Sequence, residues 1–335
     1  MRTLTAGLLT VFAATAILAA APEGYHLLKT VPITGDGGWD YVSVDVAGRR
    51  VYVSHASKVD VLDADSGAVV GQVPDTAGVH GIAVAADVGR GFTSNGRADN
   101  VTVFDLKTLK PLGTVPTGKN PDSIIYDPAT KRVFAFNGNG ASATVIDAAD
   151  SKVAGTVELG GKPEFAAADG AGHVFVNLED KAEVVKLDAK ELKVKGRWPI
   201  APPKTPVSMA IDAANHRLFV GCRSKSLVVM DCDSGKTVAT LPIGDRVDAG
   251  AFDPETKMVF CSCGDGTVTV VRQETPDQYA VVETIKTRPQ SKTMALDPKT
   301  HKLFLPGAEY KAAAAGGRGR PTMVPGSFVM LVFGR

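Results

Sequence analysis

Short runs of apolar and aromatic residues recur along the chain at a nearly constant interval. Each run has an aromatic residue at its centre, and successive aromatic residues lie 40 to 44 residues apart. The seven runs are Val51-Tyr52-Val53, Gly91-Phe92-Thr93, Val133-Phe134-Ala135, Val174-Phe175-Val176, Leu218-Phe219-Val220, Val259-Phe260-Cys261 and Leu303-Phe304-Leu305. Runs this short and this rich in β-branched and aromatic residues are typical of β-strands. The pattern therefore predicts one strand-based unit repeated seven times.

Each unit contains three further strand-like segments. A strand precedes each aromatic run and ends at Asp45, Ala85, Asp127, Asp169, Asp212, Asp253 or Asp297. A third strand follows, as at Val101–Asp105, and a fourth, as at Val153–Val157. Four short strands in about 40 residues are typical of a propeller blade. The sequence predicts an all-β fold, a seven-bladed β-propeller of four-stranded antiparallel blades. Residues Lys181 to Lys195 also fit an amphipathic helix, but the repeat register favours strands there.

The two ends of the chain complement each other. The last unit stops at its third strand, Ser327 to Phe333, whereas Leu27 to Ile33 at the other end matches the fourth-strand pattern. A last blade closed by the N-terminal strand would pair an otherwise open sheet edge. We therefore expect residues 25–335 to form a single propeller. An insertion at about 309–326 is rich in Gly, Ala and Pro, which predicts a mobile loop.

The first 21 residues have the composition of a targeting segment. Arg2 is followed by an uncharged apolar run over residues 4–21 that ends in alanines, before Pro22-Glu23-Gly24. This pattern predicts a signal peptide over residues 1–21. The run is also near the minimum length of a membrane anchor, but its alanine content and acidic flank favour cleavage. We expect a periplasmic or secreted protein with no membrane span after signal cleavage.

The repeat text resembles a known family. In the third unit it reads Asn120-Pro121, Asp127-Pro128, Lys131-Arg132-Val133-Phe134, Val145-Ile146-Asp147 and Gly155-Thr156-Val157. This pattern, which covers residues 25–335, resembles the YVTN-type seven-bladed β-propeller repeat proteins and their exported YncE-like group. Gly91-Phe92-Thr93 and the late insertion depart from it. The resemblance implies the fold but no single activity, because such propellers range from scaffolds to lactonases and lyases.

Charge and motif content exclude several classes of function. The 37 Lys and Arg residues nearly balance the 36 Asp and Glu residues, so no global field attracts nucleic acid. The chain has no Gly-x-Ser-x-Gly elbow, phosphate-binding loop, His-Glu-x-x-His helix or Cys-x-x-Cys pair. We expect a monomer that binds a small molecule or an envelope protein.

One column of the repeat is rich in ionisable residues. Five positions before the end of each first strand lie Asp40, His80, Asp122, Glu164, Val207, Asp248 and Lys292. The loops that lead into first strands gather at one mouth of a propeller channel, so the sequence predicts a ring of these side chains there. Chance placement of 36 acidic residues and six histidines would leave most of these positions without one. The Asp column at the first-strand ends is equally rich, but turn chemistry explains it.

The ring suggests a ligand. Carboxylates that converge on one mouth repel each other unless a cation lies among them. Asp40, Asp122 and Glu164 offer oxygen ligands suited to Ca²⁺ or Mg²⁺, and His80 extends the choice to a transition metal. No spacing motif selects one metal, so the cofactor prediction is a divalent cation of open identity.

Other candidate residues share this face of the predicted ring. His55, at a second-strand end in the blade next to His80, is either a ligand or acid-base partner or a hydrogen-bonded structural residue. Trp39 could stack on a ligand or fill the channel wall. The four cysteines, Cys222, Cys232, Cys261 and Cys263, leave a Cys222–Cys263 bridge or buried free thiols open.

The sequence favours a binding protein that recognises a small ligand, a cation or an envelope protein at the channel mouth. The alternative is a lactonase-like or lyase-like enzyme at the same mouth. Such an enzyme would use His80 or His55 as proton carrier. Its metal or substrate would be held by Asp40, Asp122, Glu164 and Asp248.

Overall fold

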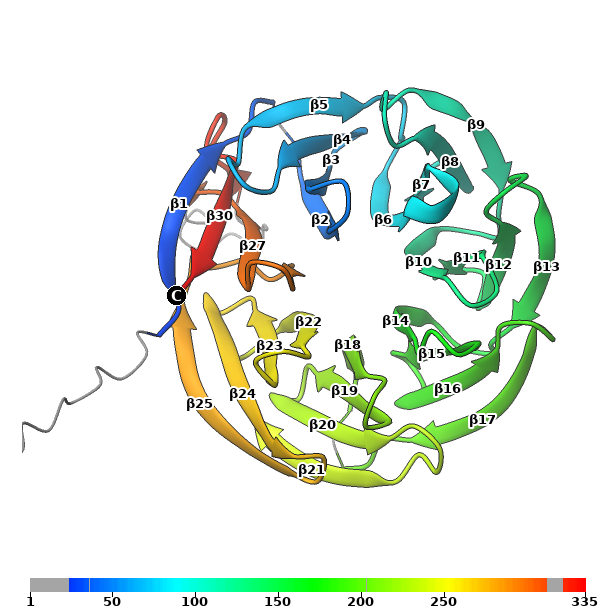
Figure 1. Ribbon diagram of the computed structural model, residues 1–335, viewed down its shortest axis with the longest axis vertical. Helices are drawn as coiled ribbons and strands as arrows, with labels where there is room; N and C mark the ends of the chain where they lie inside the picture. Colours follow the sequence, from blue (N-terminus) through cyan, green and yellow to red (C-terminus); the bar gives the residue numbers. More distant parts are fainter. Residues whose placement is uncertain (1–23, 36, 203, 312–321) are drawn as a thin grey trace, which may run out of the picture.

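The computed structural model describes residues 24–35, 37–202, 204–311 and 322–335. Seven four-stranded antiparallel sheets stand around a central axis, which confirms the predicted seven-bladed β-propeller (Figure 1). The described residues contain no α-helix, and one 3-10 turn, η1 (Ala86–Val88), follows β6. Within those ranges, no helix is long and apolar enough to cross a membrane. The signal-peptide prediction for residues 1–21 lies outside the described residues.

The strands form four concentric shells. The innermost are β2 (Trp39–Asp45), β6 (Val79–Ala85), β10 (Pro121–Asp127), β14 (Pro163–Ala168), β18 (Pro206–Asp212), β22 (Val247–Asp253) and β26 (Ala295–Asp297). The second are β3 (Arg50–His55), β7 (Arg90–Asn95), β11 (Arg132–Asn137), β15 (His173–Leu178), β19 (Arg217–Cys222), β23 (Met258–Cys263) and β27 (Lys302–Gly307). The third are β4 (Lys58–Asp63), β8 (Asn100–Asp105), β12 (Ser142–Asp147), β16 (Glu183–Asp188), β20 (Ser226–Asp231), β24 (Thr267–Thr275) and β30 (Val329–Gly334). The outermost are β5 (Val69–Val73), β9 (Pro111–Pro116), β13 (Val153–Glu158), β17 (Lys193–Pro199), β21 (Thr237–Pro242), β25 (Gln278–Lys286) and β1 (His26–Pro32).

The burial of the second strands explains why an apolar and aromatic pattern recurs in the sequence. The second strands are buried on both faces, because neighbouring blades cover them from both sides. The central aromatic residue of every unit is at most 1% exposed, from Tyr52 in β3 to Phe304 in β27. Outermost strands such as β5 are largely exposed. The segment Lys181 to Lys195 contains β16 and the start of β17, so the repeat register predicted it correctly.

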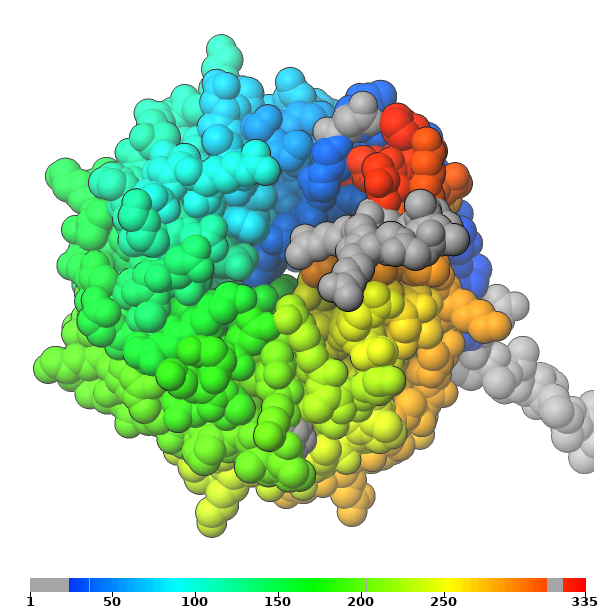
Figure 2. All heavy atoms as spheres, turned by 180° about the vertical axis from the view of Figure 1, so that it is seen from behind, coloured from blue at the N-terminus to red at the C-terminus, as the bar shows by residue number. Residues whose placement is uncertain are grey.

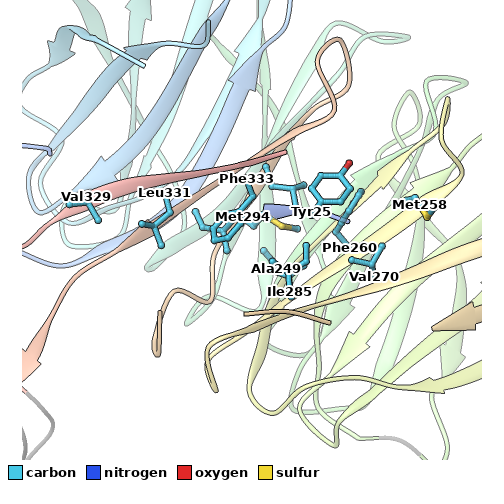
Figure 3. Close-up of a cluster of buried hydrophobic side chains, with 13 residues drawn as sticks. Tyr25, Ala249, Met258, Phe260, Val270, Ile285, Met294, Val329, Leu331 and Phe333 are labelled. Carbon is cyan, nitrogen blue, oxygen red and sulfur yellow. The ribbon is translucent and has the colours of Figure 1, made fainter. Parts of the chain in front are cut away.

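The ring closes where the two ends of the chain meet. β1 pairs with β30 in antiparallel register from His26 opposite Gly334 to Pro32 opposite Val329. Just before β1, Tyr25 is 6% exposed, and its ring lies edge-on to Phe260 with the centroids 5.1 Å apart. Its hydroxyl donates a hydrogen bond of 3.0 Å to the carbonyl oxygen of His301. Tyr25 therefore fastens the last two blades together inside one apolar cluster (Figure 3).

The late insertion and the cysteines can also be placed. The described arms of the insertion form a short hairpin, β28 (Tyr310–Lys311) with β29 (Thr322–Met323). Residues 312–321 lie outside the described part of the chain, so the predicted mobility of the loop stays a prediction.

All four cysteines are buried free thiols, and no Cys222–Cys263 bridge is present. Burial raises the pKa of the Cys222 thiol to about 12.

Candidate functional site

A backbone irregularity occurs at the ring position of six blades. In β2, β6, β10, β14, β18 and β22 the register with the second strand shifts by one extra residue next to the ring position. Such β-bulges bend a strand and redirect its side chains. These innermost strands surround the central opening (Figure 1). The ring residues are therefore presented from bulged strand starts at one mouth of the channel.

Buried serines hold these bulges in place. Ser94 is fully buried in β7, and its hydroxyl accepts a 2.8 Å hydrogen bond from the N–H of Gly81 in the same blade. The same hydroxyl donates to the carbonyl oxygen of Asp122 in the next blade. One side chain thus links the backbones that carry two neighbouring ring residues.

Replacing Ser94 by alanine is expected to destabilise the protein. The change leaves the Gly81 N–H and the Asp122 carbonyl without this partner, which lowers the free energy of unfolding by about 1–3 kcal/mol. Urea denaturation of Ser94→Ala measures the loss. Ser57→Ala, at an exposed position, is the control and should change it by less than about 0.5 kcal/mol. Equal stability of both variants would contradict a role for Ser94 in holding the bulges.

Three ring side chains from neighbouring blades converge. His80 Nδ1 lies 2.7 Å from Asp40 Oδ2 and 3.7 Å from Asp122 Oδ1. One ligand atom from each residue lies within 4.8 Å of the other two. Among the described residues this is the one group of three or more His, Cys, Asp and Glu side chains with metal-ligand spacing. We call these three residues the Asp–His–Asp cluster.

The other half of the mouth is an alternating chain of charges. Lys292 Nζ lies 2.5 Å from Asp248 Oδ2, and Arg223 bridges Asp248 and Glu179 at 3.7 and 2.5 Å. Lys162 Nζ lies 3.6 Å from Glu164 Oε2 and also pairs with Glu179. The carboxylate side chains are only 9–12% exposed, whereas the three cations are 41–42% exposed. We call this set the charged arc; its members are Lys162, Glu164, Glu179, Arg223, Asp248 and Lys292.

Removing the cation of one arc pair is expected to weaken the fold. Lys292→Met leaves Asp248, whose side chain is 9% exposed, with only the more distant Arg223. The expected loss in free energy of unfolding at pH 7 is about 1–3 kcal/mol, because a buried carboxylate loses its closest partner. The double variant Lys292→Met with Asp248→Asn should recover most of that loss, as measured by urea denaturation. Failure of this rescue would mean that Lys292 acts through its aliphatic stem instead.

Burial perturbs the ionisation of the ring. Burial raises the pKa of Asp122 to about 6, although nearby His80 opposes the shift. Burial, together with the charge of Asp122, raises the pKa of Glu164 to about 8. The pKa of Asp248 is also raised by burial, against the effect of Lys292. Burial alone would lower the pKa of His80, but its hydrogen bond with Asp40 and the charge of Asp122 raise it. The anionic forms of Asp122, Glu164 and Asp248 are therefore poorly stabilised.

Two aromatic residues directly follow ring residues in the sequence and pack against each other. Tyr41, the neighbour of Asp40, packs against Phe165, the neighbour of Glu164, with ring centroids 4.6 Å apart. Burial raises the pKa of Tyr41 well above its usual range, and the charges of all four ring carboxylates add to the shift. Phe165 also lines an apolar hollow of about 660 Å³ that includes Val42 and Met294. The aromatic pair thus lies between the polar mouth and an apolar part of the channel.

Trp39 borders the mouth. Its ring stacks on Phe328 with centroids 5.0 Å apart and lies 6.4 Å from the ring of Tyr310 in the insertion. With Asp40, His80 and Arg97, Trp39 lines a depression of about 410 Å³. Figure 2 shows this face, where the red C-terminal residues lie beside blue residues from near the N-terminus. An aromatic wall therefore adjoins the Asp–His–Asp cluster.

The structure does not bring every predicted residue into the site. His55 is fully buried, and its Nδ1 lies 2.7 Å from Oδ2 of Asp60, a residue of its own hairpin. Its ring packs on Phe328 at 4.5 Å, so His55 and His80 have separate carboxylate partners. Val207 occupies the ring position of its blade and is fully buried and apolar.

Sequence reasoning missed three charged members of the site. Glu179 and Arg223 each lie one residue beyond a second-strand end, and Lys162 lies two residues before Glu164. Glu179 and Arg223 directly follow the second-strand ends Leu178 and Cys222, and so lie one position outside that column of the repeat. Counting each column one residue past the strand end would have found Glu179 and Arg223.

The fold and the mouth define a seven-bladed β-propeller with a polar, ionisable channel opening. Among solved structures the chain is similar to hydrazine synthase of Kuenenia stuttgartiensis, at 16% identity and a TM-score of 0.72, over 82% of this chain and 94% of that one. It is also similar to U3-55K, at 11% identity and a TM-score of 0.76, over 92% and 98% of the two chains. The RRP9 WD40 repeats match at 10% identity and a TM-score of 0.77, over 92% and 97%.

Identities this low establish the fold alone. No protein-family model matches the chain, and no curated protein matches it. The YVTN-type and YncE-like resemblance therefore stays a proposal, whereas the seven-bladed ring that it implied is confirmed.

Proposed function

We propose that the protein is a binding protein that takes a cation or a small, positively charged ligand at the channel mouth. The observation that carries this proposal is Glu164, which is only 9% exposed and whose Oε2 has no hydrogen-bond partner. A buried carboxylate oxygen without a partner is unfavourable unless a ligand or water satisfies it. The apolar leader over residues 4–21 supports a protein that works outside the cytoplasm.

The charge balance of the mouth supports a positive ligand. The ring and arc together contain five carboxylates, and the arc contains three permanent cations. The carboxylates are Asp40, Asp122, Glu164, Glu179 and Asp248, and the cations are Lys162, Arg223 and Lys292. Burial raises the pKa of Glu164 and Asp122, and neighbouring carboxylates add to both shifts, so a cation among these groups would stabilise the anionic forms. The depression of about 410 Å³ beside His80 gives a small ligand access.

The binding proposal is tested with protein purified through a chelator and then freed of it. Thermal unfolding is measured with Zn²⁺, Mn²⁺, Ca²⁺ or the diamine putrescine added. We expect at least one probe at 100 times its Kd to stabilise the protein by about 2.7 kcal/mol. The effect should be lost in Asp122→Asn and kept in Asp169→Asn, a carboxylate of the opposite face that pairs with His173. The absence of any shift with all four probes would refute the proposal.

An enzyme remains a second candidate because of one contact. His80 is hydrogen-bonded to Asp40 at 2.7 Å and is about one third exposed, an arrangement that acid-base chemistry uses. A lactonase-like or lyase-like activity would then depend on His80. Hydrolysis of simple lactones by the wild type and by His80→Ala, with and without Zn²⁺, tests it. Equal background rates would exclude that lactonase role.

A further inference from the structure

The Asp–His–Asp cluster has the composition of a transition-metal site. One imidazole and two carboxylates form a mixed nitrogen and oxygen set, which suits Zn²⁺, Mn²⁺ or Fe²⁺ better than Ca²⁺ or Mg²⁺. Atoms that share one such ion at about 2.0–2.2 Å lie within about 4.4 Å of each other. The separations of 2.7 and 3.7 Å from His80 Nδ1 are within that limit. One ligand atom of each of the three residues lies within 4.8 Å of the other two.

The backbone makes room for this imidazole. A Cβ atom at Gly96 would lie 2.6 Å from His80 Nε2 and 2.7 Å from Asn120 Oδ1. No other residue type fits at position 96 without displacing His80. The glycine therefore lets the ring sit with Nδ1 directed at the two carboxylates, which leaves Nε2 on the side of Asn120.

A second, independent observation also indicates a missing ligand. Glu164, from the blade after Asp122, is nine-tenths buried and its Oε2 has no hydrogen-bond partner. The closest ion-pair partner of that oxygen, Lys162, lies at 3.6 Å and is itself paired with Glu179. A carboxylate in the outer shell of a metal site accepts a hydrogen bond from a metal-bound water. Such a water would satisfy Glu164.

We propose that Asp40, His80 and Asp122 bind one divalent transition-metal ion, with Glu164 accepting a hydrogen bond from a water on that ion. The inference rests on the proposed cation-binding function and names the cation. Three protein ligands leave coordination positions open. The side chains of Asp40 and His80 are 29% and 30% exposed beside the depression, so the open positions face the solvent. The bound ion is therefore accessible to a small ligand.

Calorimetric titration of the chelator-treated protein tests the metal site. Zn²⁺ and Mn²⁺ are expected to bind with one ion per chain and at least 100-fold more tightly than Ca²⁺. His80→Ala and Asp122→Asn should weaken Zn²⁺ binding at least 100-fold. Glu164→Gln should weaken it about 10-fold, as an outer-shell change does. His173→Ala is the matched control: it removes a histidine 2.8 Å from Asp169 that belongs to no such cluster, and should leave binding unchanged.

The outcomes separate this inference from the proposed function. Binding of Ca²⁺ as tight as Zn²⁺, or of putrescine alone, would overturn the transition-metal site and leave cation binding at the mouth intact. Failure of every probe would overturn both. Co²⁺ absorption in the visible range, compared between the wild type and His80→Ala, checks whether His80 ligates the ion. A Co²⁺ spectrum that His80→Ala leaves unchanged would place the metal elsewhere.

Discussion

Replacing Tyr25 by alanine is expected to lower the free energy of unfolding by about 3–5 kcal/mol, the range for a large buried aromatic side chain. The ring of Tyr25 packs on Phe260, and its hydroxyl donates to the carbonyl oxygen of His301. Arg335, the C-terminal residue, lies 5.1 Å over the same ring. The change removes these three contacts at the one junction where the ring is closed by pairing of the two chain ends.

Urea denaturation followed by tryptophan fluorescence measures this loss. Leu27→Ala is the matched control, because Leu27 lies two residues away on β1 and is 49% exposed. The control should change the free energy of unfolding by less than about 0.5 kcal/mol. If the two variants were equally stable, the closure would depend on the β1–β30 backbone ladder and not on the Tyr25 cluster.

Glu164→Gln is expected to stabilise the metal-free protein at pH 8 and to have little effect at pH 5. Burial, with the charge of Asp122, raises the pKa of Glu164 from 4.5 to about 8, so the folded state holds a proton that the unfolded chain has released across that interval. The unfolded state binds fewer protons there, so stability falls as pH rises. The stability that depends on protonated Glu164 is fully present below pH 4.5 and is lost by about pH 8. Glutamine stays neutral and avoids the loss.

The difference in free energy of unfolding between Glu164→Gln and wild type should therefore grow with pH. We expect a gain of about 1 kcal/mol per pH unit between pH 5.5 and 7.5, close to the value for one proton. Urea denaturation in chelator-containing buffer measures it. Glu158→Gln, at an exposed position of β13, is the control and should show no such slope. A variant less stable than wild type at both pH values would show that Glu164 acts as a structural anion.

The fold could be predicted because it repeats. Each unit has a buried aromatic residue, such as Phe134 or Phe219, at the same point of its second strand. The same short apolar pattern therefore occurs seven times in the sequence, which makes the strand prediction more certain than a single occurrence would. The same register decided the segment Lys181 to Lys195, whose local propensity also fits a helix. Closure by the N-terminal strand could be predicted because the last unit lacked a strand that the first residues supplied.

The site could be predicted only in part. The ring residues could be predicted because the innermost strands have their bulges at the same place in each unit. Asp40, His80 and Asp122 therefore occupy equivalent positions of the repeat. The competing Asp column is indeed turn chemistry, since Asp127 accepts hydrogen bonds from Thr130 at the opposite strand end. Pairing within the mouth depends on how far long side chains reach across blades, which a sequence does not show. Arg223 illustrates this, because it reaches Glu179 of the preceding blade and Asp248 of the following one.

The pairing of β1 with β30 also fixes the order in which the protein can be completed. The ribosome makes β1, at His26–Pro32, first and β30, at Val329–Gly334, last. Until β30 emerges from the ribosome, β1 has no partner and the outer edge of β27 is unpaired. The other six blades can form before β30 is made, but the circle stays open until β30 pairs with β1 and β27. During that time, both unpaired edges, those of β1 and β27, are available to pair with other nascent chains.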